Sequence, residues 1–167
     1  MATKTIEQSI SSIQETINLI MDITEGLSED MIRYKPSENE WSIIQILSHL
    51  AEAIPYWLSE IKHVTDAPGS QWGRGLQDPA RLAAVSNPEN LSIVKVKDEV
   101  AGLKQQVETG LIDLTEEQLR EESPHRNFQK FGNKPVSFII DHFIEEHLEG
   151  HYGQIKRNLS KLNELGE

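Results

Sequence analysis

The sequence of 167 residues contains no cysteine. Without thiols the chain cannot form a disulfide framework, a thiolate zinc site or an iron–sulfur centre, and it has no cysteine nucleophile. Positive charge is also scarce, because 16 Lys and Arg stand against 27 Asp and Glu and give a formal net charge of -11. Nucleic acids and anionic membrane surfaces are bound by basic faces, so we expect no nucleic acid and no membrane among the partners.

Long hydrophobic runs are absent as well. No stretch approaches the roughly 20 apolar residues that a helix needs to cross a bilayer, and the residues from Met1 to Glu7 lack the apolar run of a signal peptide. We therefore expect a cytoplasmic protein. Since single domains commonly have about 100 to 200 residues, we expect one domain over residues 1–167.

Four long segments carry apolar residues at helical spacing, and no segment shows the sustained alternation of a strand. The expected helices cover roughly residues 6–25, 42–62, 90–112 and 135–162. Ser42 and Gln45 have capping-box spacing at the start of the second helix. Because amphipathic helices must bury their stripes together, we expect an all-α fold, a four-helix bundle without strands.

The connection between the second and third helices, residues 62–89, is long and rich in glycine and proline. Connections of this length in compact domains tend to be lids or crossovers, and residues 78–82 predict a short helix within it. Two similar segments, 27–33 and 114–120, predict short accessory helices after the first and third long helices. Their likeness has two explanations, an internal duplication or convergence on a good helix-start sequence.

The fourth helix carries two histidines near the centre of its apolar stripe. His147 and His151 are four residues apart, so they lie one turn above the other on the same face. Such a pair can chelate one metal ion. The alternative is two core histidines that hydrogen-bond to neighbours, although each buried imidazole nitrogen then needs a partner of its own. The spacing alone leaves both interpretations open.

The other four histidines give weaker patterns. His49 lies in the second helix at the edge of its apolar stripe. Periodicity slightly favours a boundary residue that reaches water over one that points across the bundle. His63, at the end of that helix, His125, in a loop, and His142, which projects away from His147, are expected at the surface.

Two motifs together resemble the DinB/YfiT-like superfamily of bacterial four-helix bundles. They are W-S-x-x-x-I-x-x-H-L over residues 41–50 and H-x-x-x-H-x-G-Q over residues 147–154, and the resemblance covers nearly the whole chain. It implies that His49, His147 and His151 bind one divalent metal ion. Three neutral imidazoles without a thiolate suit zinc or nickel, with iron, cobalt and manganese as alternatives, and three protein ligands leave a position open for water or substrate.

The resemblance implies a class of reaction rather than a substrate. One hypothesis is a metal-dependent enzyme, either a hydrolase or a thiol S-transferase that acts on a small molecule with a low-molecular-weight thiol. A second is a non-catalytic binding or stress-response module whose metal site is structural or vestigial. A third is a helical interaction domain that binds no metal. The resemblance also implies a homodimer.

No general base is evident in the sequence. Glu52, one turn after the first histidine of the motif set, could orient that imidazole or accept a proton, but a solvated carboxylate is the simpler expectation. Gln154 lies on the inner face and could hydrogen-bond a metal ligand. Glu145, Glu146 and Glu149 form a charge run that we expect to be mainly solvated.

Overall fold

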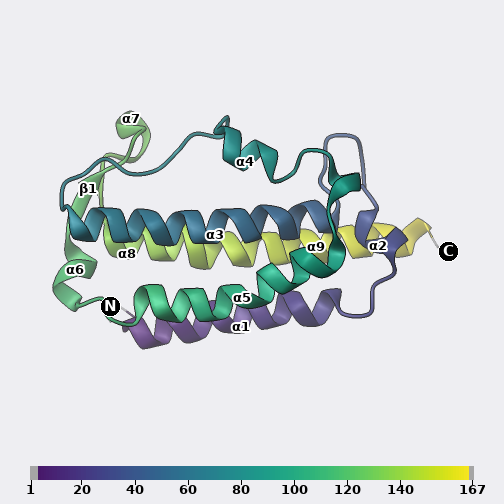
Figure 1. Cartoon of the computed structure of the whole chain (residues 1–167), viewed down its shortest axis with the longest axis horizontal. Coiled ribbons are helices and arrows are strands. Elements are labelled where there is room, and N and C mark those ends of the chain that lie inside the picture. The colour runs from purple at the N-terminus through teal and green to yellow at the C-terminus, as the bar shows by residue number, and fades with distance from the viewer. Residues whose placement is uncertain (1–3, 166–167) are drawn as a thin grey trace.

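The computed structural model describes residues 4–165, and its body consists of four long helical rods. The rods are α1 (Ile6–Thr24), α3 (Ile43–Asp66), α5 (Ile93–Leu111) and a fourth made of α8 (Val136–Phe138), the π-helical segment η2 (Ile139–Glu145) and α9 (Glu146–Leu165). Figure 1 shows them lying side by side along the long axis. α5 packs against both α1 and α3, and α9 contacts α1 and α3. The expected four-helix bundle is confirmed.

Side-chain caps set where the helices begin. The Ser42 hydroxyl accepts a hydrogen bond from the Gln45 backbone, and the Gln45 side chain accepts one from the Ser42 backbone at 2.9 Å. Such a box satisfies two backbone donors that the first helical turn leaves free. α3 then continues through Pro55 and ends four residues later than its sequence pattern predicted.

The accessory helices are short. They are α2 (Glu29–Arg33), α4 (Pro79–Ala83), the 3-10 helix η1 (Pro88–Asn90), α6 (Glu116–Arg120) and α7 (Phe128–Phe131). α2 and α6 are the two similar segments of the sequence, and they start at the matching caps Ser28 and Thr115. α4 confirms the short helix expected in the long connection.

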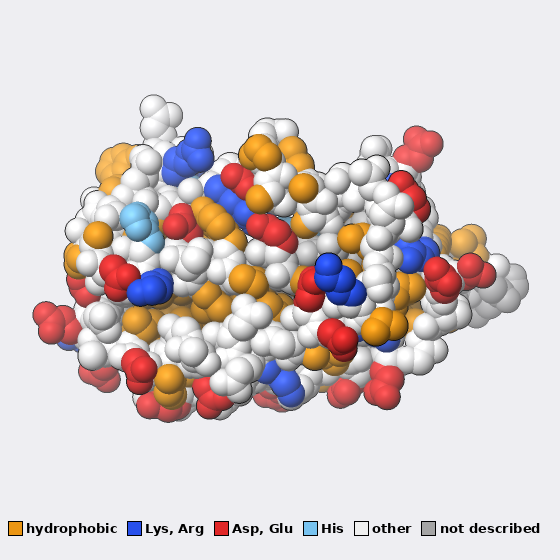
Figure 2. Space-filling model, viewed as in Figure 1, with side chains coloured by type: hydrophobic (Ala, Val, Ile, Leu, Met, Phe, Trp, Pro, Cys, Tyr) orange, Lys and Arg blue, Asp and Glu red, His pale blue; other side chains and the backbone are white. Residues whose placement is uncertain are grey.

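The core is formed mainly by aliphatic side chains from the inner faces of the four rods. Ile13, Ile17, Leu50 and Val100 are among its fully buried members. Acidic side chains are spread around the outline of the face in Figure 2, as the net charge of -11 predicts. No helix within residues 4–165 is both long enough and apolar enough to span a bilayer.

The expectation of no strand is wrong. β1 (Glu122–Pro124) and β2 (Asn133–Pro135) pair antiparallel, with Ser123 opposite Lys134. Strands of three residues are too short to show a sustained alternation of apolar and polar residues, so the sequence pattern could not reveal them.

This small hairpin fixes the long connection on the bundle. Trp72, at 1% exposure, donates from its backbone to Pro124 and from its indole nitrogen to the Ser123 carbonyl at 2.8 Å. At the other end of the connection, Ser48 and Gln45 of α3 donate to carbonyls just after α4. The connection therefore runs back over α3 with both ends tied, as Figure 1 shows.

Candidate metal centre

The three histidines of the sequence motifs converge on one point between α3 and α9. The Nε2 atoms of His49 and His147 lie 3.0 Å apart. The ring of His151 completes the group, with centroids 4.9 Å from His49 and 4.7 Å from His147. Potential ligand atoms of all three lie within 4.8 Å of one another. The edge position of His49 therefore points across the bundle and not toward water.

Hydrogen bonds orient the two histidines of α9. The Nδ1 atom of His147 lies 3.1 Å from the Phe143 carbonyl, and that of His151 lies 2.8 Å from Oε1 of Gln154. Both oxygens are acceptors, so each Nδ1 carries the proton and each Nε2 keeps a free lone pair. Metal-binding histidines are commonly held in this way. Gln154 thus makes the contact that its place in the sequence suggested.

His49 is the most buried of the three, with 2% exposure. Its Nδ1 is the buried side-chain polar atom in residues 4–165 that has no hydrogen-bond partner. Its other nitrogen faces only the unprotonated nitrogen of His147. A buried imidazole with this environment is poorly satisfied by protein groups alone. Three nitrogen lone pairs around one point form a donor set that suits a divalent transition metal.

The histidines are held in the neutral form that metal ligands require. Burial lowers the pKa of His49 to about 2 and that of His147 to about 4, and the neighbouring histidines add to both shifts by charge repulsion. Burial also lowers the pKa of His151. At neutral pH no proton therefore competes for these nitrogens.

A cavity of about 440 Å³ opens beside the three imidazoles, a size typical of small-molecule sites. The stacked rings of Trp57 and Phe143, with centroids 4.2 Å apart, form an apolar wall together with Ala53. Arg81 and Arg157 also line the cavity. Phe143 and Trp57 lie on the apolar stripes of their helices, where the spacing predicts core residues. The two arginines have no such signal, because loop and helix-flank positions show no periodicity.

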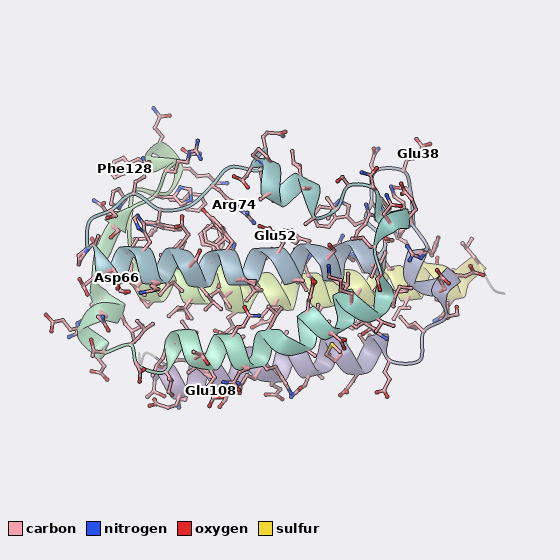
Figure 3. The ribbon with its side chains drawn as sticks, in the orientation of Figure 1. Glu38, Glu52, Asp66, Arg74, Glu108 and Phe128 are labelled. Atoms are coloured by element: carbon pink, nitrogen blue, oxygen red, sulfur yellow. The ribbon has the colours of Figure 1, made fainter. Side chains whose placement is uncertain are left out.

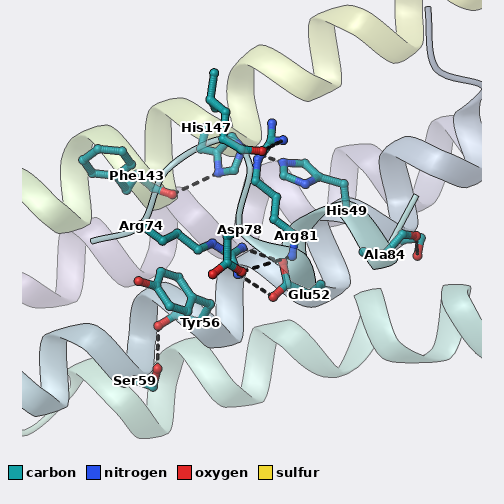
Figure 4. Close-up of polar contacts among 12 residues, drawn as sticks. His49, Glu52, Tyr56, Ser59, Arg74, Asp78, Arg81, Ala84, Phe143 and His147 are labelled. Carbon is teal, nitrogen blue, oxygen red and sulfur yellow. Dashed lines mark hydrogen bonds and ion pairs between the residues drawn. The ribbon is translucent and has the colours of Figure 1, made fainter. Parts of the chain in front are cut away.

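Glu52 neither orients His49 nor stands free in water. Its carboxylate accepts two hydrogen bonds from the Arg74 guanidinium, at 2.5 and 2.7 Å, and Asp78 accepts a third at 3.3 Å. Arg74 also lies 4.0 Å above the Tyr56 ring. Figures 3 and 4 show this ion pair between the connection and α3. Its role is to fix the connection next to the histidines.

Two other expectations about polar residues need correction. His125 is 3% exposed and not at the surface; it packs on Trp72 and Phe131 and accepts from the Asn127 backbone at 2.8 Å. Glu145 is 4% exposed and pairs with Lys4 at 2.5 Å. The partners of His125 come from the long connection and from the loop of the hairpin, and the partner of Glu145 comes from the opposite end of the chain. Periodicity within one helix cannot reveal such contacts.

The remaining predictions of exposure are confirmed. His63 and His142 are exposed, and so are Glu146 and Glu149 of the charge run.

Comparisons with known proteins agree with this geometry. The sequence model of the DinB superfamily matches residues 12–155. The uncharacterized protein YuaE of Bacillus subtilis (strain 168) is 29% identical over 150 residues, which cover 82% of this chain and 88% of YuaE. YfiT from Bacillus subtilis, described as "a probable metal-dependent hydrolase with an unusual four-helix bundle topology", has the same fold, with a TM-score of 0.72 over 96% of this chain and 92% of YfiT at 13% identity. Because the family match spans most of the chain and includes all three histidines, the protein belongs to the DinB superfamily.

Proposed function

We propose that this protein is a metal-dependent hydrolase that holds one divalent ion, zinc or nickel, through His49, His147 and His151. The observation that carries the proposal is the convergence of three neutral imidazoles, one buried and two partly buried, beside a cavity. A divalent ion bound by three imidazoles lowers the pKa of bound water and polarises substrate oxygen. The description of YfiT, a protein of the same fold, supports hydrolysis as the class of reaction.

The residues of the chain have separable tasks in this proposal. The three histidines hold the ion, and the Phe143 carbonyl and Gln154 keep two of them in the required tautomer. The apolar wall excludes water from one side of the cavity and offers a surface for the organic part of a substrate. No carboxylate within residues 4–165 joins the three-histidine group. Imidazole nitrogens are therefore the only ligands that this group offers to the ion.

A thiol S-transferase would use the same centre. Since the chain contains no cysteine, any thiol in the chemistry would have to arrive as a small molecule. This reaction, the low-molecular-weight thiol, the homodimer and the cytoplasmic location remain predictions. The non-catalytic module remains the alternative to an enzyme.

Metal analysis of untagged protein purified without chelators tests the centre. We expect one equivalent of metal per chain, lost in His147→Ala and His151→Ala and retained in the matched control His63→Ala, whose histidine is exposed on α3. A metal content that is unchanged in His147→Ala and His151→Ala would refute the site.

A substrate panel then tests the reaction. Zinc- and nickel-loaded protein would be assayed against esters and amides, and against electrophiles with added thiols. Turnover of esters or amides that disappears in His147→Ala supports the hydrolase. Turnover of electrophiles only in the presence of thiols supports the transferase. A stoichiometric ion without turnover in either group favours the non-catalytic module.

A further inference from the structure

The cavity beside the histidines has a charge opposite to that of the whole protein. Three arginines line it, Arg74, Arg81 and Arg157, against a single carboxylate, Glu146. In the chain as a whole, acidic residues outnumber basic ones by 27 to 16. A cluster of guanidinium groups at this one place therefore needs a local explanation.

Arg74 is accounted for by its ion pairs with Glu52 and Asp78. Arg81 and Arg157 have no carboxylate within 4.0 Å in the part of the chain that the structure describes; Arg81 is partly buried, whereas Arg157 is exposed and acts on the Glu40 carboxylate only at longer range. The Arg81 guanidinium donates one hydrogen bond within the described residues, to the Leu76 carbonyl at 3.1 Å. The carboxylate of Glu146 lies 3.3 Å from Nδ1 of His142 and makes no ion pair with either arginine.

The position of Arg81 is built into the fold. Its helix α4 is capped by the Asp78 side chain, which accepts from the Arg81 backbone at 3.3 Å. The carbonyl of Ala84, just after α4, accepts from Ser48 of α3. The Arg81 guanidinium lies 5.9 Å from the Trp41 ring centroid. Figure 4 shows Arg81 on the same side of the helices as His49 and His147.

The two free arginines and the apolar wall lie at opposite ends of the centre. α3 and α9 run antiparallel, since Trp57 stacks on Phe143 while the Trp41 carbonyl accepts from Asn158. Arg157 is next to Asn158, and Arg81 lies beside Trp41. The histidines come between these two levels, so the cavity has an apolar end, a ligand centre and a cationic end.

We propose that the substrate carries an anionic carboxylate or phosphate group, which Arg81 and Arg157 bind while its apolar part lies against Trp57 and Phe143. Guanidinium forks match the planar or tetrahedral oxygens of these groups and bind them by charge-assisted hydrogen bonds. In a chain of net charge -11, local cations are also needed to offset repulsion of such a ligand.

This inference rests on the proposed function, but it can be tested without turnover. Calorimetry would measure the binding of 3-phenylpropionate and phenyl phosphate, with the neutral analogues 3-phenylpropanol and phenol, to the protein as purified, metal-free and zinc-loaded. The metal-free arm is essential because an anion can also ligate zinc directly. Comparing the two anions distinguishes carboxylate from phosphate recognition.

Variants of the two arginines test whether these side chains bind the anion. We expect Arg81→Gln and Arg157→Gln each to raise the Kd of the preferred anion about tenfold or more in both metal states, with no change for the neutral analogue. Arg120→Gln, the same change at an exposed arginine of α6 outside the cavity, should leave the Kd unchanged. Melting curves of all three variants would show whether they are folded.

Three results would overturn the proposal: no preference for an anion over its neutral analogue, affinities unaffected by either variant, or anion binding that requires zinc. Its failure is distinguishable from failure of the proposed function. If no metal binds at the histidines but arginine-dependent anion binding persists, the hydrolase proposal fails and the anion site stands. If metal and hydrolysis are found but the variants bind like the wild type, only the anion site fails.

Discussion

Replacing His49 by leucine should lower the stability of the metal-bound protein but not that of the metal-free protein. In the metal-free protein the substitution removes a buried nitrogen that has no hydrogen-bond partner, and an unpartnered buried polar atom costs about 1–3 kcal/mol. The leucine has a similar volume, so repacking should cost no more than about 1.5 kcal/mol. The two effects offset each other, and we expect His49→Leu to leave the free energy of unfolding of the metal-free protein nearly unchanged.

With metal present the same variant should lose all stabilisation by the ion. A ligand that binds only the folded state adds about 2.7 kcal/mol at 100 times its Kd and about 4.1 kcal/mol at 1,000 times. Each kcal/mol corresponds to roughly 2–4 °C in Tm for a chain of this size. Wild-type protein at 100 times the Kd should therefore melt about 5–11 °C above the metal-free form, and His49→Leu should show no such gain.

Thermal melts of wild type and variant, each with chelator and with zinc, measure this difference directly. Ile54→Ala is the matched control on the same helix, because Ile54 is fully buried and packs in the core. It should lower stability by about 2–5 kcal/mol in both states. If His49→Leu behaves like the control and destabilises both forms equally, the histidine is a packing residue and the reasoning is refuted.

Three further predictions concern pH, the connection and the metal ligands. The pKa of His147, about 4, lies below the ordinary 6.5, so protons bind the unfolded chain first. Denaturant unfolding of the metal-free protein should show a free energy of unfolding that falls from pH 6.5 toward pH 4. The dependence of this free energy on pH should be weaker in His147→Leu, and an equal dependence in both proteins would contradict the prediction. Gly73→Ala should lower Tm more than Gly69→Ala: both have positive φ, but only the first places a methyl group 2.4 Å from His125. Equal losses of Tm in the two variants would mean that the His125 imidazole moves to make room for the methyl group. Gln154→Leu should weaken zinc binding roughly 10- to 100-fold in a competition titration, and unchanged affinity would dismiss its orienting role.

Local sequence patterns were sufficient to predict the bundle. The helical rods follow from apolar spacing and from caps such as Ser42, which act within a single turn. The pair His147 and His151 could be found because both lie on one helix. His49 could not be assigned from its own helix, since its partners come from α9, and only the family motif connected them.

The features that sequence analysis missed depend on contacts between distant segments. His125 is buried because Trp72 and the hairpin cover it. Glu145 is buried because Lys4, at the other end of the chain, neutralises it. Arg81 reaches the cavity only because the connection is tied to α3 at both ends. Hydrophobic periodicity describes one element at a time and therefore contains no information on these contacts.

The π-helical segment at residues 139–145 sets the rotation of α8 relative to α9. Successive residues of an α-helix are turned by about 100°, and a π-helical turn contains one residue more than an α-helical one. Phe143 lies within the segment and His147 just after it, and both line the cavity because residues four apart share one face of a helix. Deleting one residue between 139 and 142 would restore an α-helix and turn α8 by about 100°, while Phe143 and His147 would keep their spacing of four residues. The burial of Val136 in α8 thus depends on the length of one helical segment as well as on the identity of its side chains.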